Sequence, residues 1–256
     1  MGGVLLVTGG ARGIGRATVE LAAAKGWDVA VGYRSRKDEA DAAVAAIEKL
    51  GRRAVAVQAD MASEADVTTM FEQTQKKLGE ISGLVNSAGI STRIRGDEVS
   101  AEQLEQLMAV NVIGPMLCCR EGIRRMSTKH GGKGGVIVNV GSMAAAFGGR
   151  PGSTHYAGSK GAIDSYTKGL AKEVATEGVR VNVVRPGVTL TDMVSAVRDD
   201  PAIKAAINAT IPMARPAEPS EIAAPIVWLL SEEASFVTGA IIDASGGGFV
   251  IGAATA

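Results

Sequence analysis

The sequence lacks the features that identify several large classes of protein. Its 27 Lys and Arg residues balance 27 Asp and Glu residues, so no basic excess exists to bind nucleic acid or an anionic membrane. No apolar run reaches the roughly 20 residues that a membrane-spanning helix requires. The two cysteines, Cys118 and Cys119, are adjacent and cannot form a disulfide framework. The two histidines are far apart and belong to no cluster of metal ligands, so we expect no metal site.

The composition is otherwise typical of a globular protein, with one exception. At 46% hydrophobic and 21% charged residues, the chain is too apolar to be disordered. The first residues lack the basic region that begins a signal peptide, and together with the cysteine usage this favours a cytoplasmic protein. The exception is glycine, with 33 residues in 256, nearly twice the usual level of about 7%.

Short runs rich in Val and Ile recur along the chain and are typical of strands buried on both faces. They lie at Val4–Val7, Asp28–Gly32, Ala54–Gln58, Gly83–Val85, Val136–Val140, Arg180–Val184 and Ala240–Ile242. Segments of helical periodicity alternate with them, at Thr18–Lys25, Asp38–Leu50, Ala101–Met126, Ser153–Glu177 and Ser220–Leu230. This alternation predicts one α/β domain over residues 1–256: a Rossmann-type, doubly wound, mainly parallel seven-stranded sheet with helices on both faces. Ligands bind such sheets beyond the carboxyl ends of the strands.

A glycine-rich turn, Thr8-Gly-Gly-Ala-Arg-Gly-Ile-Gly15, joins the first predicted strand to a helix. Its glycines allow the backbone to turn sharply and to approach a ligand closely, and the helix N-terminus favours a phosphate group. The spacing differs from the usual G-x-G-x-x-G, and Arg16-Ala17 after Gly15 excludes a P-loop. A tight turn without a ligand is the alternative interpretation. The position after the first strand favours a dinucleotide.

The end of the second predicted strand distinguishes between dinucleotides. An acidic residue there binds the ribose of NAD, but the run Val29–Arg36 contains no carboxylate, and the first one after it is Asp38. Arg34, Ser35 and Arg12 instead suit the 2′-phosphate of NADP, because a guanidinium matches phosphate geometry. A solvated loop is the alternative for these residues. The pattern favours NADP(H) over NAD(H).

Tyr156 and Lys160 are four residues apart in a predicted helix, so they share one face. A tyrosine with its usual pKa of about 10 is a poor base at neutral pH. A neighbouring ammonium group, shielded from water, lowers that pKa. This spacing alone is a weak signal, since most such pairs are surface neighbours.

Together, these motifs resemble the short-chain dehydrogenase/reductase family from Val4 to Gly248. The matching residues occur in the family's order: Thr8–Gly15, Asn86-Ser-Ala-Gly89, Asn111, Ser142, Tyr156-x-x-x-Lys160 and Pro186-Gly187. The stretch Val136–Lys160 is similar to glucose 1-dehydrogenase-like members. One difference is that Ser142 precedes Tyr156 by one residue more than is common, which affects the shape of the pocket.

The resemblance implies roles for four catalytic residues. Tyr156 would be the general acid/base, and Lys160 would lower its pKa and hold the nicotinamide ribose. Ser142 would hydrogen-bond the substrate oxygen, and Asn111 would hold a water molecule that links Lys160 to solvent. The implied cofactor contacts are Gly9, Arg12, Gly13, Ile14, Gly15, Arg34, Ser35, Asp60, Met61, Asn86, Ala88, Gly89, Tyr156, Lys160, Pro186, Gly187, Thr189 and Thr191.

These features predict an NADP-dependent oxidoreductase that transfers hydride reversibly between NADP(H) and a small carbonyl/alcohol substrate, acting on a CH–OH donor. The alternatives are a non-catalytic dinucleotide-sensing protein on the same fold and an NAD-dependent sugar dehydrogenase such as a glucose 1-dehydrogenase. The resemblance implies a homotetramer, and a segment at about residues 190–215 that closes over the substrate. Adjacent Cys118 and Cys119 are expected to be buried packing residues.

Overall fold

The computed structural model describes residues 2–194, 197 and 199–248, and a sheet of seven parallel strands forms its centre. The strand order is β3-β2-β1-β4-β5-β6-β7. The strands are β1 (Val4–Thr8), β2 (Asp28–Tyr33), β3 (Ala54–Gln58), β4 (Ile81–Asn86), β5 (Gly135–Val140), β6 (Val179–Pro186) and β7 (Ile241–Ala244). All of the pairs between them are parallel, which confirms the predicted doubly wound sheet.

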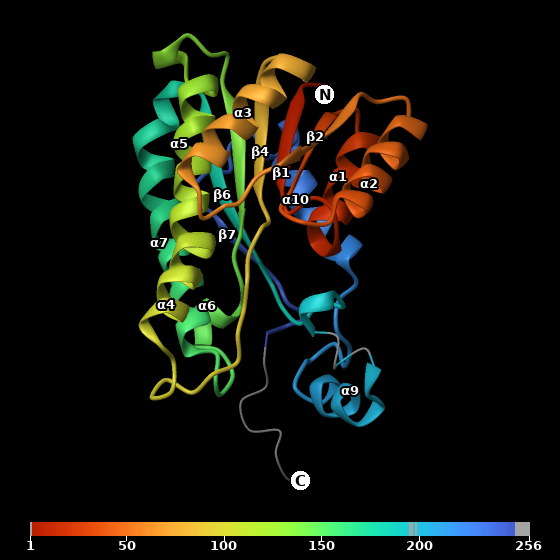
Figure 1. The fold of residues 1–256 in the computed structure, drawn as a ribbon, viewed down its shortest axis with the longest axis vertical. Helices are drawn as coiled ribbons and strands as arrows, with labels where there is room; N and C mark the ends of the chain where they lie inside the picture. Colours follow the sequence, from red (N-terminus) through yellow and green to blue (C-terminus); the bar gives the residue numbers. More distant parts are fainter. Residues whose placement is uncertain (1, 195–196, 198, 249–256) are drawn as a thin grey trace.

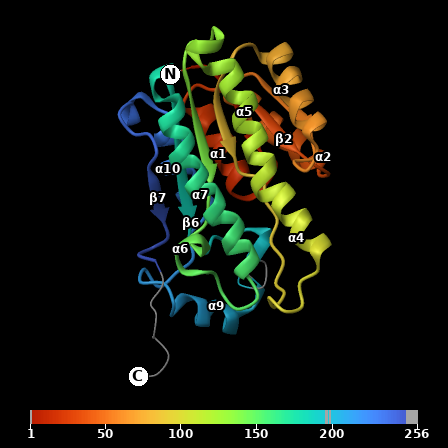
Figure 2. The same cartoon turned by 90° about the vertical axis from the view of Figure 1, so that its left-hand side faces the viewer.

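Helices cover both faces of the sheet (Figures 1 and 2). The first layer holds α1 (Gly13–Ala24), α2 (Lys37–Lys49) and α10 (Pro219–Leu229). The second layer holds α3 (Glu64–Leu78), α4 (Ala101–Met108), α5 (Gly114–Met126) and α7 (Thr154–Val174). The short helices α6 (Ala144–Phe147) and α9 (Pro201–Asn208) lie beyond the carboxyl ends of the strands.

Burial of apolar strand residues explains this arrangement. Every residue of β1 is buried, and successive side chains alternate between the two helical layers. Leu5 joins the core beneath α1 and α10, whereas Leu6 joins the core beneath α3 and α5. Each fully buried leucine contributes about 1.5–3 kcal/mol relative to exposure. The sheet is therefore held from both sides, and its strand ends keep a fixed position.

Helix α3 was not predicted from the sequence. Its apolar residues are spaced widely among polar ones, but Val67, Met70 and Phe71 are buried. Ser63 caps the helix by accepting a hydrogen bond from the Asp66 backbone N–H. A good N-cap and an apolar stripe at helical spacing were therefore the available signals.

The predicted helix Ala101–Met126 is not continuous. A π-helical segment, Ala109–Ile113, separates α4 from α5. Such segments are rare and occur frequently at functional sites. This one contains Asn111, which is fully buried. A helical periodicity cannot reveal one inserted residue, because the flanking turns retain the same apolar face.

Two absences concern only the described parts of the chain. Within residues 2–194, 197 and 199–248, no helix combines the length and apolarity needed to cross a membrane. The same residues contain no group of three or more His, Cys, Asp and Glu side chains placed to hold a metal ion.

Candidate active site

A cavity of about 690 Å³ opens beyond the carboxyl ends of the strands, where the topology places ligands. It brings together segments that lie far apart in the sequence: the turn after β1, the ends of β2 to β6, and the start of α7. The predicted site residues that line it are Gly9, Arg12, Gly13, Ile14, Arg34, Ser35, Asp60, Met61, Ala88, Gly89, Ser142, Tyr156, Lys160, Pro186, Gly187, Thr189 and Thr191. Gly15, Asn86 and Asn111 are not among the lining residues.

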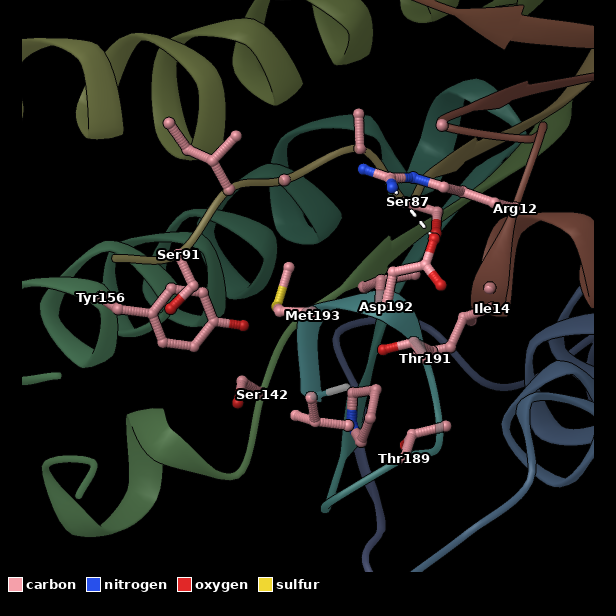
Figure 3. Close-up of a pocket in the computed structure, with 18 of the residues that line it drawn as sticks. Arg12, Ile14, Ser87, Ser91, Ser142, Tyr156, Thr189, Thr191, Asp192 and Met193 are labelled. Atoms are coloured by element: carbon pink, nitrogen blue, oxygen red, sulfur yellow. Dashed lines mark hydrogen bonds and ion pairs between the residues drawn. The ribbon is translucent and has the colours of Figure 1, made fainter. Parts of the chain in front are cut away.

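The Tyr156 hydroxyl lies beside the Ser142 side chain in the cavity (Figure 3). Tyr156 comes from the first turn of α7, and Ser142 follows β5. Burial raises the pKa of Tyr156 above its ordinary value, in contrast to the predicted lowering by Lys160, and a hydrogen bond with Ser142 opposes that rise. The phenol is therefore protonated at neutral pH and can donate a proton to a group in the cavity.

Lys160 lies one helical turn beyond Tyr156 and is buried. Its Nζ donates a hydrogen bond to the Val140 carbonyl oxygen at 2.9 Å and lies 5.9 Å from the centre of the Tyr156 ring. Burial lowers the pKa of Lys160 to about 8, partly offset by the negative charge of Asp164. Asp164 is in turn bonded to Arg185, with its Oδ2 at 2.9 Å from Arg185 Nε. The ammonium is thus held near the tyrosine at an energetic cost.

That cost predicts a stabilising substitution, Lys160→Met. The folded pKa of about 8 lies below the usual 10.5, so the burial penalty is fully present below pH 8. It shrinks as pH rises from 8 to 10.5, because the folded protein loses its proton first. We expect Lys160→Met to raise the free energy of unfolding by about 1–3 kcal/mol at pH 7, with a smaller gain at pH 10.

Urea denaturation at pH 7 and pH 10 measures this effect. Lys172→Met is the control, because Lys172 is exposed on the same helix, and it should change stability little at either pH. A Lys160→Met protein less stable than the parent at pH 7 would contradict the burial penalty.

Asn111 positions the loop that follows β4. Its Oδ1 accepts a hydrogen bond from the Ile90 backbone N–H at 2.9 Å, and its Nδ2 donates to the Ile90 carbonyl oxygen at 2.9 Å. Nδ2 also donates to Ser159 Oγ at 3.2 Å. The side chain therefore joins the π-helical segment to both the loop and α7. The water-holding role remains a prediction.

The glycine turn is closely packed against the end of β4. Thr8 Oγ1 accepts hydrogen bonds from the backbone N–H groups of Ser87 and Ala88, both at 3.1 Å. Gly9 has a φ of +65°, and a Cβ atom there would lie 2.9 Å from Ala88 Cα. Gly15 is buried within the turn, where a Cβ would overlap the Gly9 carbonyl oxygen. Gly15 thus shapes the turn without facing the cavity.

The end of β2 contributes both charge signs to the cavity. Arg34 and Ser35 line it as predicted, and Arg36 lines it as well. Glu39, in the first turn of α2, also lines the cavity and accepts a hydrogen bond from Arg36 Nη1 at 3.0 Å. The sequence pattern did not identify Glu39. The dinucleotide pattern concerns the residues directly after the second strand, and Glu39 lies beyond them, in the next helix.

Asn86 does not face the cavity. Its side chain is buried, and Nδ2 donates to Asn139 Oδ1 at 2.8 Å, while Asn139 Nδ2 donates to Thr167 Oγ1 at 2.9 Å. These bonds join β4, β5 and α7 beneath the catalytic residues. Asn86 therefore acts through the scaffold, in contrast to the predicted direct lining of the cofactor site.

Asp60 is held at the cavity wall by its own loop. Its Oδ1 accepts a hydrogen bond from the Ala62 backbone N–H at 2.9 Å, and its backbone N–H donates to Asp66 Oδ2 at 2.9 Å. Met61 beside it is nearly buried. Both residues line the cavity, as predicted.

The segment after β6 adds residues that the sequence did not single out. Asp192 bonds Arg12 of the glycine turn, with Oδ2 and Nη1 3.0 Å apart, so the pair joins that turn to the segment after β6 (Figure 3). Met193, Ile203 and Ile207 also line the cavity. Of the predicted closing segment, about residues 190–215, positions 195, 196 and 198 lie outside the described residues.

Cys118 and Cys119 are fully buried free thiols, as predicted. Burial raises the pKa of Cys118 well above its ordinary value and that of Cys119 to about 12. Both are therefore protonated and unreactive at neutral pH.

Known proteins resemble this chain over nearly its full length. Residues 9–248 match the family model described as enoyl-(acyl carrier protein) reductase. The chain is 44% identical over 245 residues to the uncharacterised oxidoreductase YgfF of Escherichia coli, covering 95% of this chain and 99% of that protein. It is 38% identical over 244 residues to 3-oxoacyl-(acyl-carrier-protein) reductase of Homo sapiens, covering 95% and 97% of the two chains.

A solved structure agrees with these matches. A short chain dehydrogenase from Burkholderia cenocepacia, in complex with NADP, has a TM-score of 0.89 and 34% identity, covering 95% of this chain and 96% of that one. Because the fold, the glycine turn and the sequence agree along the whole chain, it belongs to the short-chain dehydrogenase/reductase family and is an oxidoreductase of that family.

Proposed function

We propose that this protein transfers hydride reversibly between NADP(H) and a carbonyl/alcohol substrate. The observation that carries the proposal is the placement of Tyr156, Ser142 and Lys160 in one cavity with the glycine turn and Arg34. A protein that only binds dinucleotides does not need a phenol, a hydroxyl and an ammonium grouped at the other end of its cavity. The non-catalytic alternative would bind NADPH without turnover.

The cavity fits a dinucleotide. A Cβ on Gly13 would lie 3.1 Å from Thr191 Cγ2, so only glycine leaves the space there open. The N-terminus of α1 faces the same turn and suits a pyrophosphate. Gly9, Gly13, Ala88 and Gly187 would border the cofactor, and when bound it would supply the hydride.

Tyr156 and Ser142 perform the proton chemistry in this proposal. In the reductive direction, Tyr156 Oη donates its proton to the carbonyl oxygen of the substrate. Ser142 donates a hydrogen bond to the same oxygen and stabilises the charge that develops on it. The adjacent Lys160 ammonium stabilises the phenolate that remains. In the oxidative direction the phenolate takes the proton from the alcohol.

A panel of carbonyl compounds tests the function directly. Oxidation of NADPH is followed by absorbance with ketones, sugars, steroids and acyl thioesters. Turnover with at least one class is expected. Tight NADPH binding with no turnover for any class would favour the dinucleotide-sensing alternative. Glucose in the panel, assayed with NAD in the oxidative direction, tests the narrower resemblance to glucose 1-dehydrogenases.

Arg34 is proposed to select NADP(H) by binding its 2′-phosphate. We expect Arg34→Ala to weaken NADPH binding by at least about tenfold, since a hydrogen bond to a charged group contributes about 1.5–3 kcal/mol. NADH binding should change little. Equilibrium binding, followed by cofactor fluorescence, gives both constants. The relative in complex with NADP supports this preference.

A matched control separates this effect from a general loss of positive charge near the cavity. Lys37→Ala removes an exposed cation three residues away that pairs with Asp41 and does not line the cavity. It should leave the NADPH/NADH ratio unchanged. The NAD alternative rests on Glu39, whose buried Oε2 has no hydrogen-bond partner among the described residues. An unchanged ratio in Arg34→Ala would favour that alternative.

Assembly, domain extent and location are further proposals. We expect a homotetramer in the cytoplasm, with residues 101–126 and 153–177 at one interface, built from a single domain over 1–256. Size-exclusion chromatography with light scattering measures the oligomeric state. The segment at about 190–215 would close over the substrate.

A further inference from the structure

Two arginines that are not among the predicted cofactor contacts also line the cavity. Arg93 lies in the loop after β4, and Arg150 lies in the loop between α6 and α7. Both belong to the same cavity as Tyr156 and Ser142. Neither is in the glycine turn or at the end of β2, where the dinucleotide phosphates are proposed to bind. Their role therefore concerns the other ligand of the cavity.

We propose that the substrate carries a carboxylate as well as its carbonyl or alcohol group, and that Arg93 and Arg150 bind that carboxylate. This inference rests on the proposed function and names the substrate class of the same site. A guanidinium and a carboxylate match geometrically and form paired, charge-assisted hydrogen bonds.

Hydrogen bonds tie both arginines to neighbouring segments. Arg93 Nε donates to the Pro151 carbonyl oxygen at 3.2 Å, and the Ile94 backbone N–H donates to the Gly152 carbonyl oxygen at 2.9 Å. The two loops are thus bonded to each other. Arg150 Nη2 donates to Thr210 Oγ1 at 3.0 Å, which ties its loop to the segment after α9. These bonds position the two cations beside the cavity.

The two cations also act on each other. Burial lowers the pKa of Arg150 below its ordinary value, and the positive charge of Arg93 lowers it further. Bringing like charges together in a partly buried place is unfavourable. A carboxylate bound by both arginines would offset this repulsion.

Apolar side chains line the same cavity. Phe147, Ile203 and Ile207 line it, and Phe147 and Ile203 are 37% and 39% exposed. A substrate that covered them would bury apolar surface and gain about 25 cal/mol per Å². The cavity therefore suits a keto acid with a hydrocarbon spacer between its carbonyl group and its carboxylate.

Matched pairs of substrates test the inference on the unaltered protein. The probes are 4-oxopentanoate and its methyl ester, which differ only in the charge at one end. We expect kcat/KM for the acid to exceed that for the ester by at least about tenfold, as for a charged hydrogen bond. Equal values for acid and ester would overturn the proposal.

Substitutions then assign the preference to the two arginines. Arg93→Gln and Arg150→Gln should each lower the acid-to-ester ratio by about tenfold or more. Arg150→Lys should lower it less, since the charge stays but the paired geometry is lost. Arg95→Gln is the control, because Arg95 is exposed, pairs with Asp97 and does not line the cavity. If kcat/KM for the acid and for the ester fell equally in these variants, the assignment of the carboxylate to the two arginines would be wrong.

Two further measurements separate the possible failures. Pentanoate, which has no carbonyl to reduce, should raise the midpoint of thermal unfolding, and the effect should be lost in Arg150→Gln. Hydroxyacetone phosphate, compared with hydroxyacetone, tests the other common anion; a larger preference for that phosphate than for the carboxylate would overturn the assignment of a carboxylate. If the esters are reduced as efficiently as the acids, the carboxylate inference fails and the proposed function stands. If no carbonyl compound is reduced, the proposed function itself fails.

Discussion

Replacing Tyr156 by phenylalanine is expected to lower turnover by about a thousandfold, within the range measured for loss of a general acid or base. The phenol oxygen lies in the cavity beside Ser142, and its hydrogen is the proton proposed to reach the substrate. Phenylalanine keeps the ring and removes only that oxygen. NADPH affinity should therefore change little, because the glycine turn and Arg34 are untouched.

Steady-state rates and NADPH binding, measured on the same preparations, test this prediction. Tyr166→Phe is the matched control, since Tyr166 lies on the same helix, α7, but does not line the cavity. It should retain most of the activity. Equal turnover in Tyr156→Phe and the parent would refute the acid/base role. A parallel loss of NADPH binding would indicate a structural role instead.

Gly15→Ala is expected to damage both folding and cofactor binding. The added Cβ would overlap the Gly9 carbonyl oxygen and lie 2.8 Å from the Gly9 carbonyl carbon and 3.1 Å from Gly10 Cα. These are backbone atoms of the turn itself, so no side chain can move aside. We expect the free energy of unfolding to fall by about 1–3 kcal/mol, as for overpacked cores. NADPH binding should fall because Gly9 and Gly13 are displaced.

Gly169→Ala is the control for this substitution. Gly169 lies on α7, and a Cβ there would meet nothing within 4 Å. Alanine should therefore stabilise the helix by about 0.5–1 kcal/mol. Urea denaturation and NADPH titration measure both variants. A Gly15→Ala protein with the stability and NADPH affinity of the parent would show that the turn can rearrange.

The strands were predictable from the sequence because their burial on both faces leaves no polar alternation to obscure them. Leu5 and Leu6 illustrate this, since each enters a different core. The π-helical segment around Asn111 was not predictable. One additional residue in a helix leaves the apolar pattern on either side intact, and the bond from Asn111 to Ile90 forms only in the folded chain.

The candidate site was predictable where a short motif has few common structural roles. The Tyr156/Lys160 pair is one example, and both of its residues line the cavity. The glycine turn is another, and it lines the cavity through Gly9, Ala11, Arg12, Gly13 and Ile14. The placement of Asn86 and Arg150 relative to the cavity could not be predicted, for different reasons. The direction of the Asn86 side chain depends on Asn139, 53 residues later. Arg150 lies in a loop whose position depends on Thr210.

The topology of the sheet has a consequence for how the chain folds. β1 is an inner strand, and its Val4 pairs with both Asp28 of β2 and Ile81 of β4. The ribosome therefore synthesises the second partner strand of β1 long after the first. No two neighbouring strands are joined by a hairpin, and every pairing must close a long loop. On a ribosome, the first three strands emerge with one edge of β1 open. We therefore expect slow refolding, a need for protection of that edge during synthesis, and catalytic competence only after β6 has docked.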